Sequence, residues 1–285
     1  MRLFNILLAL LTLFATGLHT DIQAQDHPFQ GGEEISYKLR YKWGLINADI
    51  ARLDFNIQNE TFDGEPCFRL VTRGATSNLA ASLVKVKYYY DSHFRRSDLT
   101  PVAFYRRQTE GSYWAKNDYT WDKTGRRLHA IVDKSTRPLR DTVFTSAEVI
   151  HDVISAIYSI RAADLDAIKR GKTLHLVAAL DCNMYDMFID YERSENKKVP
   201  DMGTFATDLF VMRVQTRDGA EQLSKESAIA LSNKGGGSLA PISMWITQDE
   251  NRAVVFFSTA IAFGSINGRL TNASGTRCPL KPVTK

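Results

Sequence analysis

The sequence predicts a mainly β protein: a strongly curved antiparallel sheet that forms a barrel, half-barrel or sandwich, with one or two short helices inserted near residues 146–170. Three observations support this fold class. Residues 35–43 alternate strictly between apolar and polar side chains, and the alternation that follows slips by one residue. Many short segments rich in aromatic and β-branched residues then follow, separated by turn residues.

The first 24 residues have the pattern of a signal peptide. Arg2 precedes a nearly unbroken apolar run over residues 3–14, and small and polar residues lead to Ala24. A run of about a dozen residues suits a signal peptide, whereas a membrane-spanning helix needs about 20. We therefore expect cleavage near Ala24 and a periplasmic or secreted mature protein without a transmembrane segment, the alternative being an N-terminal anchor.

The composition is that of a globular protein. Hydrophobic residues make up 44% of the 285 residues and charged residues 24%. We expect residues 25–285 to form a single β-rich domain with a short flexible tail from about residue 271. Three cysteines, Cys67, Cys182 and Cys278, are too widely spaced for a redox or zinc motif. Because three is an odd number, at least one is unpaired or pairs between chains, and we expect at most one disulfide.

The net charge of +4 is modest, and the basic residues are dispersed. Short basic pairs such as Lys85/Lys87 and Arg106/Arg107 fall on expected strands and fit a solvated face better than an acidic partner. The export signal and the absence of a recognised motif argue against nucleic-acid binding.

The first expected strand is residues 35–43. Its odd positions are apolar or aromatic and its even positions polar, which places one set of side chains on each face of a sheet. The apolar set continues at Ile46, Ala48 and Ile50, and then shifts to the phase of Ala51. Both halves can face one core only if an extra residue is inserted, which predicts a β-bulge near Ile50-Ala51. Asp63-Gly64 then predicts a hairpin turn.

Further strands are expected where apolar and aromatic residues cluster between turn residues. These segments are 67–72, 84–90, 102–108, 113–121 and 128–132, and, after the helices, 173–180, 184–192, 209–216, 225–231, 241–247, 253–258 and 265–270.

Thr145 and Glu148 have the spacing of a capping box and predict the start of a helix. Apolar residues then recur at helical spacing and form one stripe. They are Ile150, Val153, Ile154, Ile157 and Tyr158. A second short helix is expected over residues 164–170 and should end at Gly171.

The common catalytic and cofactor motifs are missing from the sequence. There is no phosphate-binding loop, nucleophile elbow or closely spaced histidine pair, so we predict no cofactor, metal or catalytic residue. The carboxylates of residues 181–192 could hold a cation, but an exposed acidic flank is the better interpretation. Neither His93 nor His151 has a sequence context that indicates catalysis.

The aromatic residues of the N-terminal half carry the remaining functional hint. On the concave side of a curved sheet they would line a cavity for an amphipathic or hydrophobic ligand, although an ordinary aromatic core would use the same residues. The candidate ligand-binding residues are Tyr37, Tyr41, Trp43, Tyr88, Tyr90, Phe104, Tyr113 and Trp121. The leading hypothesis is a non-catalytic periplasmic protein that binds such a ligand or an envelope partner protein. The alternatives are a hydrolase of envelope glycans or peptides with convergent Asp, Glu or His residues, and a structural module that assembles through a sheet edge.

The sequence also resembles a bacterial family, the domain of unknown function 3108. The resemblance is carried in order by Gly32-Glu33 with Trp43-Gly44, by Tyr88–Asp91 through Arg107 to Gly111, by Asp152, Ser155, Tyr158 and Arg161, and by Trp245 through Arg252 with Gly264-Ser265-Ile266. The resemblance implies an exported β-rich domain and no established activity.

Overall fold

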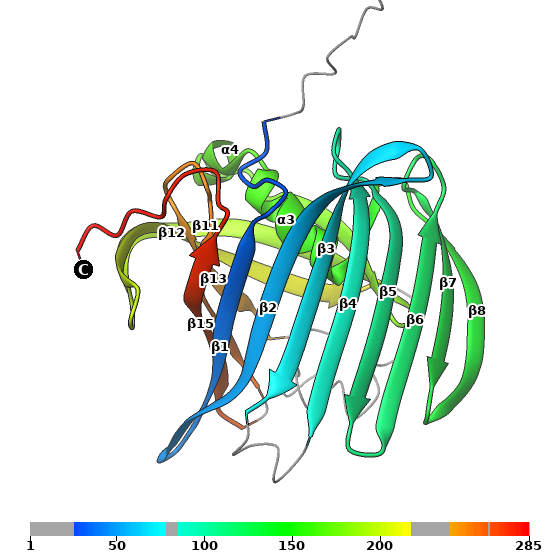
Figure 1. Cartoon of the computed structure of the whole chain (residues 1–285), viewed down its shortest axis with the longest axis horizontal. Coiled ribbons are helices and arrows are strands. Elements are labelled where there is room, and N and C mark those ends of the chain that lie inside the picture. Colours follow the sequence, from blue (N-terminus) through cyan, green and yellow to red (C-terminus); the bar gives the residue numbers. More distant parts are fainter. Residues whose placement is uncertain (1–25, 78–84, 218–239, 262, 285) are drawn as a thin grey trace, which may run out of the picture.

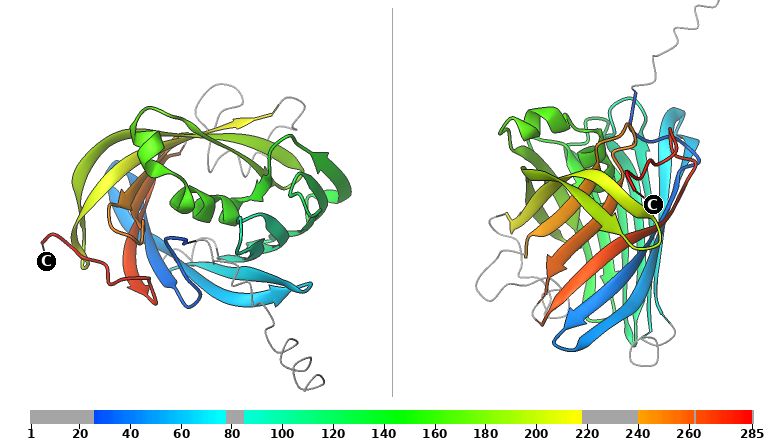
Figure 2. Two further views of the ribbon diagram at one scale, coloured as in Figure 1. Left: turned by 90° about the horizontal axis from the view of Figure 1, so that it is seen from above. Right: turned by 90° about the vertical axis from the view of Figure 1, so that its left-hand side faces the viewer.

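Over the residues that the structure describes, the protein is a 15-stranded sheet bent into a nearly closed barrel, with two short helices (Figures 1 and 2). A computed structural model describes residues 26–77, 85–217, 240–261 and 263–284. The mainly β prediction is confirmed, and of the three predicted forms the structure adopts the barrel.

The strand order follows the sequence outwards from the middle of the sheet. It runs β8-β7-β6-β5-β4-β3-β2-β1-β15-β14-β13-β12-β11-β10-β9, and among these described strands only the β9–β10 pair is parallel. The strands are β1 Glu34–Trp43, β2 Ile46–Phe62, β3 Glu65–Thr76, β4 Val86–Arg95, β5 Pro101–Glu110, β6 Tyr113–Trp121, β7 Arg127–Lys134, β8 Arg137–Thr145, β9 Ile150–Asp152, β10 Leu174–Leu180, β11 Asn183–Val199, β12 Gly203–Thr216, β13 Ile242–Thr247, β14 Val254–Ala260 and β15 Ser265–Ser274.

The bulge predicted in the second strand is confirmed. Leu39 pairs with Ala51 and Arg40 pairs with Asp49, so Ile50 is the extra residue. The turn at Asp63-Gly64 is also confirmed, with positive φ angles of 49° and 82°. Such a turn closes a two-residue hairpin because its twist matches that of the flanking strands.

Strand β8 was not predicted, because it lacks a buried apolar face. Its side chains are exposed or half-buried along its whole length, and Pro138 is tolerated because β8 lies at the sheet edge.

The predicted tail from residue 271 is wrong in its start, since β15 continues to Ser274 and Thr284 pairs with Thr204. The predicted strand 225–231 lies outside the described residues.

The predicted helix start is wrong. Helix α3 spans Val153–Ala162, and the Asp152 carboxylate caps it by accepting hydrogen bonds from the Ile154 and Ser155 amides at 2.8 and 2.9 Å. Residues 150–152 instead add β9 to the sheet beside β10, which leaves no room for a helix that begins at residue 146. The second predicted helix is confirmed as α4, Leu165–Lys169, followed by Gly171 with a positive φ.

Helix α3 lies inside the ring of strands, as the view from above in Figure 2 shows. Ile154 and Tyr158 share one hydrophobic cluster with residues of β2–β7, including Phe104. Ala156 and Ile160 share another with residues of β10–β14. The helix therefore joins the two walls of the barrel through two opposite faces.

The interior also holds a histidine with a strongly perturbed pKa. Burial lowers the pKa of His151 from 6.5 to about 4. The unfolded chain therefore binds a proton between these pH values that the folded protein does not, and acidification across this window destabilises the fold by up to about 3 kcal/mol.

We expect His151→Gln to remove most of this pH dependence. Urea unfolding at pH 7 and pH 4.5 should show that the variant loses about 2 kcal/mol less stability than the natural protein over this interval. His129→Gln is the control, because His129 is exposed and pairs with Asp141. Equal losses in the natural protein and in His151→Gln would contradict the assignment.

Candidate functional site

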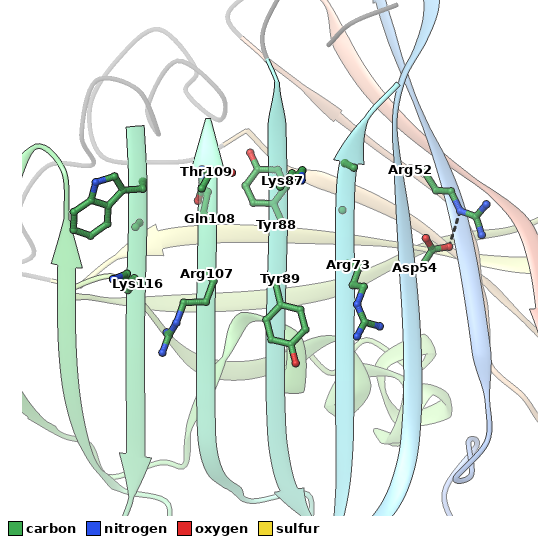
Figure 3. Close-up of a pocket in the computed structure, with 14 residues that line it drawn as sticks. Arg52, Asp54, Arg73, Lys87, Tyr88, Tyr89, Arg107, Gln108, Thr109 and Lys116 are labelled. Carbon is green, nitrogen blue, oxygen red and sulfur yellow. Dashed lines mark hydrogen bonds and ion pairs between the residues drawn. The ribbon is translucent and has the colours of Figure 1, made fainter. Parts of the chain in front are cut away.

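A hollow of about 750 Å³ lies on the outer face of β2–β6, and we call it the outer groove. Each of β3, β4, β5 and β6 contributes three consecutive residues to its wall. In β3 the middle residue, Gly74, is buried while Arg73 and Ala75 on either side are exposed. Because side chains alternate along a strand, the outer two side chains of each trio point into the groove. Figure 3 shows these side chains with α3 behind the strands.

The outer groove is rich in positive charge. Five cationic side chains line it, against one carboxylate, Asp54. The cations are Arg52, Arg73, Lys87, Arg107 and Lys116. The strand register brings them together, since Arg73 pairs across the sheet with Tyr89, and Tyr89 pairs with Arg107.

Two of the five cations are already neutralised. Arg52 donates to Asp54 at 2.7 Å, and Arg107 contacts Asp118, just outside the groove, at 2.6 Å. Within the part of the chain that the structure describes, Arg73, Lys87 and Lys116 form no ion pair. These three charges therefore remain available for an anionic ligand.

Two aromatic rings give the outer groove an apolar component. The Arg73 guanidinium lies 5.5 Å from the centre of the Tyr89 ring, and the Lys116 ammonium lies 5.1 Å from that of Trp114. The Tyr89 hydroxyl donates to Asp91 at 2.9 Å, which holds the ring in place. Such a wall can contact the carbon skeleton of a ligand while the cations bind its charge.

The Asp91 carboxylate that holds Tyr89 is ionised. Burial alone would raise the pKa of Asp91, but hydrogen bonds from Arg69, His93 and Tyr89 keep it below its ordinary value. His93 lies between Asp91 and Glu60 and contacts both. Burial would lower the pKa of His93, but hydrogen bonds to the two carboxylates raise it, and these three residues form a hydrogen-bonded support beside the groove.

The structure distributes the eight aromatic residues predicted to line one cavity over several places, although Tyr90, Phe104 and Trp121 share one hydrophobic cluster. Tyr37 and Phe104 are buried in different hydrophobic clusters, and Trp43 is 52% exposed. Tyr88 and Tyr90 lie together, with ring centres 6.1 Å apart, on the inner side of β4. The remaining three, Tyr41, Tyr113 and Trp121, are half-buried. Only Tyr88 belongs to the wall of the outer groove. A ligand-binding role for the eight residues stays a prediction.

Sequence reasoning missed most of the outer groove. Lys87 and Arg107 belong to basic pairs that the sequence predicts to form a solvated face, Tyr89 enters only through the family resemblance, and no sequence pattern marks Trp114. Period-two alternation assigns each of these side chains to a face of its own strand. The missing information was the register between strands, which no local pattern contains.

Among the residues that the structure describes, Asp91, Ser92 and His93 do not form a catalytic triad. Ser92 points to the opposite side of β4, where its hydroxyl donates to the buried Asp152 at 2.8 Å. Among the described residues, no three His, Cys, Asp or Glu side chains could hold a metal ion.

The cysteines Cys67, Cys182 and Cys278 are free thiols, and burial raises the pKa of Cys67 to about 11.

Comparisons with known proteins identify the family of this chain and a solved structure of similar fold. The sequence model of the protein family of unknown function DUF3108 matches residues 36–271. The chain belongs to the DUF3108 family. No curated protein matches the sequence. The fold is similar to the crystal structure of a β-barrel-like protein of the domain of unknown function DUF1849 from Brucella abortus, with a TM-score of 0.53 and 9% identity over 85% of this chain and 96% of that chain.

Several of the residues by which this chain resembles other DUF3108 proteins meet around α3, whereas Tyr88, Tyr89 and Arg107 lie in the wall of the outer groove. Arg161 donates to both Glu33 oxygens, at 2.6 and 2.9 Å, and Tyr158 donates to Glu33 at 3.2 Å. Arg252 donates to the Ala163 carbonyl, just beyond the helix, at 2.8 Å. In this DUF3108 protein these contacts hold the helix in the barrel, which is a structural role. No helix among the described residues is long and apolar enough to cross a membrane.

Proposed function

We propose that this protein acts outside the cytoplasm as a non-catalytic binding protein for an anionic amphipathic ligand, which it holds in the outer groove. The observation that carries the proposal is a hollow of about 750 Å³ in which three cations that form no ion pair with any described residue lie beside two aromatic rings. Ligand sites in proteins typically measure about 300–1,000 Å³. The signal-peptide pattern of residues 1–24 supports a periplasmic or secreted location.

Titration of the mature chain with dodecyl phosphate, below its micelle concentration, tests this function. Arg73→Gln/Lys87→Gln removes two charges that contact no carboxylate in the part of the chain that the structure describes, so we expect affinity to fall at least about tenfold. Binding should also weaken as salt is added. Lys123→Gln/Lys172→Gln is the matched control, because both lysines are exposed and lie outside the groove.

Two neutral or incomplete probes identify which part of the ligand is bound. Dodecyl maltoside has the chain without the charge, and inorganic phosphate has the charge without the chain, so each should bind more weakly than dodecyl phosphate. Unchanged affinity in the groove variant, or equal binding of dodecyl maltoside, would contradict the proposal. Native mass spectrometry of protein purified from its own compartment would then identify a retained natural ligand.

No arrangement of Asp, Glu and His side chains among the described residues supports the alternative of a hydrolase. The His93, Glu60 and Asp91 cluster has convergent groups, but His93 is 6% exposed, and none of the three residues lines the outer groove. A structural module would need an available sheet edge and self-association. Sedimentation of the mature chain distinguishes that alternative from a monomeric binding protein.

A further inference from the structure

A second surface lies at the turn between β1 and β2, at the end of the barrel opposite α4 (Figure 1). Four large apolar side chains are exposed there: Trp43 at 52%, Leu45 at 104%, Ile46 at 47% and Phe263 at 64%. Trp43 and Phe263 contact edge to face, with ring centres 6.1 Å apart, and Trp43 pairs across the hairpin with Ile46. We call these four residues the apolar tip. Contiguous exposed apolar side chains of this size mark an interaction site.

Backbone contacts hold the apolar tip in place. The Tyr41 hydroxyl donates to the Phe263 carbonyl at 3.0 Å. Gly264 has a φ of +89°, and a Cβ there would lie 2.0 Å from the Lys42 carbonyl oxygen, so only glycine allows the two segments to approach this closely. The tip is therefore formed before any partner binds, and little ordering entropy opposes its use.

The shape of the tip favours a lipid surface over a protein partner. A stable protein interface buries about 800 Å² on each partner, which a single turn and one adjoining segment do not offer. A protruding tip with Trp, Phe and Leu can instead enter the headgroup region of a bilayer, where the indole ring is especially favourable.

The surrounding charge fits an anionic lipid surface. Lys42 is exposed beside the tip, and Lys38 is exposed on the same strand. The outer groove lies towards the same end of the barrel, because Arg73 is near the end of β3 and Lys87 near the start of β4. Cations near an anionic surface each contribute about 1 kcal/mol to binding.

We propose that the apolar tip inserts into the surface of an anionic lipid bilayer and brings the outer groove close to the headgroups. This inference deepens the proposed function, since it names the bilayer as the source of the anionic amphiphile. The tip itself is a separate observation and has its own test.

Flotation of the mature chain with vesicles tests the inference. We expect binding to vesicles of phosphatidylcholine with phosphatidylglycerol, and weaker binding to phosphatidylcholine alone. Leu45→Ser/Phe263→Ser should reduce the partition constant at least about tenfold, since it removes two apolar side chains from the contact. Leu139→Ser/Val143→Ser is the matched control, because these side chains are 59% and 47% exposed on β8. Circular dichroism checks that each variant is folded.

The outcomes separate the two proposals. Leu45→Ser/Phe263→Ser should keep its affinity for dodecyl phosphate, because neither residue lines the outer groove. Arg73→Gln/Lys87→Gln should lose that affinity. Brominated lipids should quench Trp43 fluorescence in the natural chain, and Trp43→Phe should lose that quenching. Absence of vesicle binding by the natural chain, or unchanged binding by the tip variant, would overturn the inference. Loss of a dimer in the tip variant, with no vesicle binding, would identify the tip as a contact between copies instead.

Discussion

Replacing Glu33 with alanine should lower the free energy of unfolding by about 3–5 kcal/mol, since it leaves a buried guanidinium without its counter-ion. Glu33 is fully buried, and Arg161 is 2% exposed. Arg161 also donates to the Asn251 and Arg252 carbonyls, at 2.9 and 3.2 Å, so its position is fixed from several sides. The charge therefore cannot move to solvent when Glu33 is removed.

Urea unfolding measured by tryptophan fluorescence checks this prediction. Glu34→Ala is the matched control, because Glu34 is the exposed neighbour and its carboxylate accepts a hydrogen bond from Asn56 at 2.7 Å. We expect Glu33→Leu/Arg161→Met to recover much of the loss, since replacing both partners of a buried ion pair by apolar residues is often nearly neutral. A loss below about 1 kcal/mol in Glu33→Ala would show that solvent or another acceptor compensates Arg161.

Replacing Asp181 with asparagine should cost about 3 kcal/mol of stability for the same physical reason. Asp181 lies in the turn between β10 and β11 and accepts from Arg106 at 2.7 Å and from Lys134 at 2.5 Å. Both cations are largely buried, at 6% and 9% side-chain exposure. Asparagine keeps the shape of the side chain and tolerates the φ of 57°, so the change isolates the charge.

Asp201→Asn separates the buried charge from the backbone conformation. Asp201 also has a positive φ, 69°, but its side chain is 81% exposed and pairs with Arg269 at 3.0 Å. We expect this control to change the free energy of unfolding by less than about 0.5 kcal/mol. Similar losses in the two variants, measured by urea unfolding, would mean that the turn and not the ion pair governs the cost.

The two ion pairs also show where local sequence information ends. Glu33 and Arg161 are separated by 128 residues, and Arg106 and Asp181 by 75. In the sequence each is an ordinary charged residue, and the predicted acidic flank at residues 181–192 was wrong for Asp181. Its burial arises because the β10–β11 turn meets β5, β6 and β7, where Arg106, Tyr119 and Lys134 contact it.

The sequence by itself determined the alternation of β1, the bulge at Ile50 and the hairpin at Asp63-Gly64. Each of these depends on neighbouring residues and on the period of two of an extended chain. The start of α3 and the edge strand β8 were decided by the tertiary structure, because β9 pairs with β10 and no side chain of β8 is fully buried. The outer groove was likewise decided by the tertiary structure. Its charges come from five strands, and only the register between those strands places Arg73, Tyr89 and Arg107 side by side.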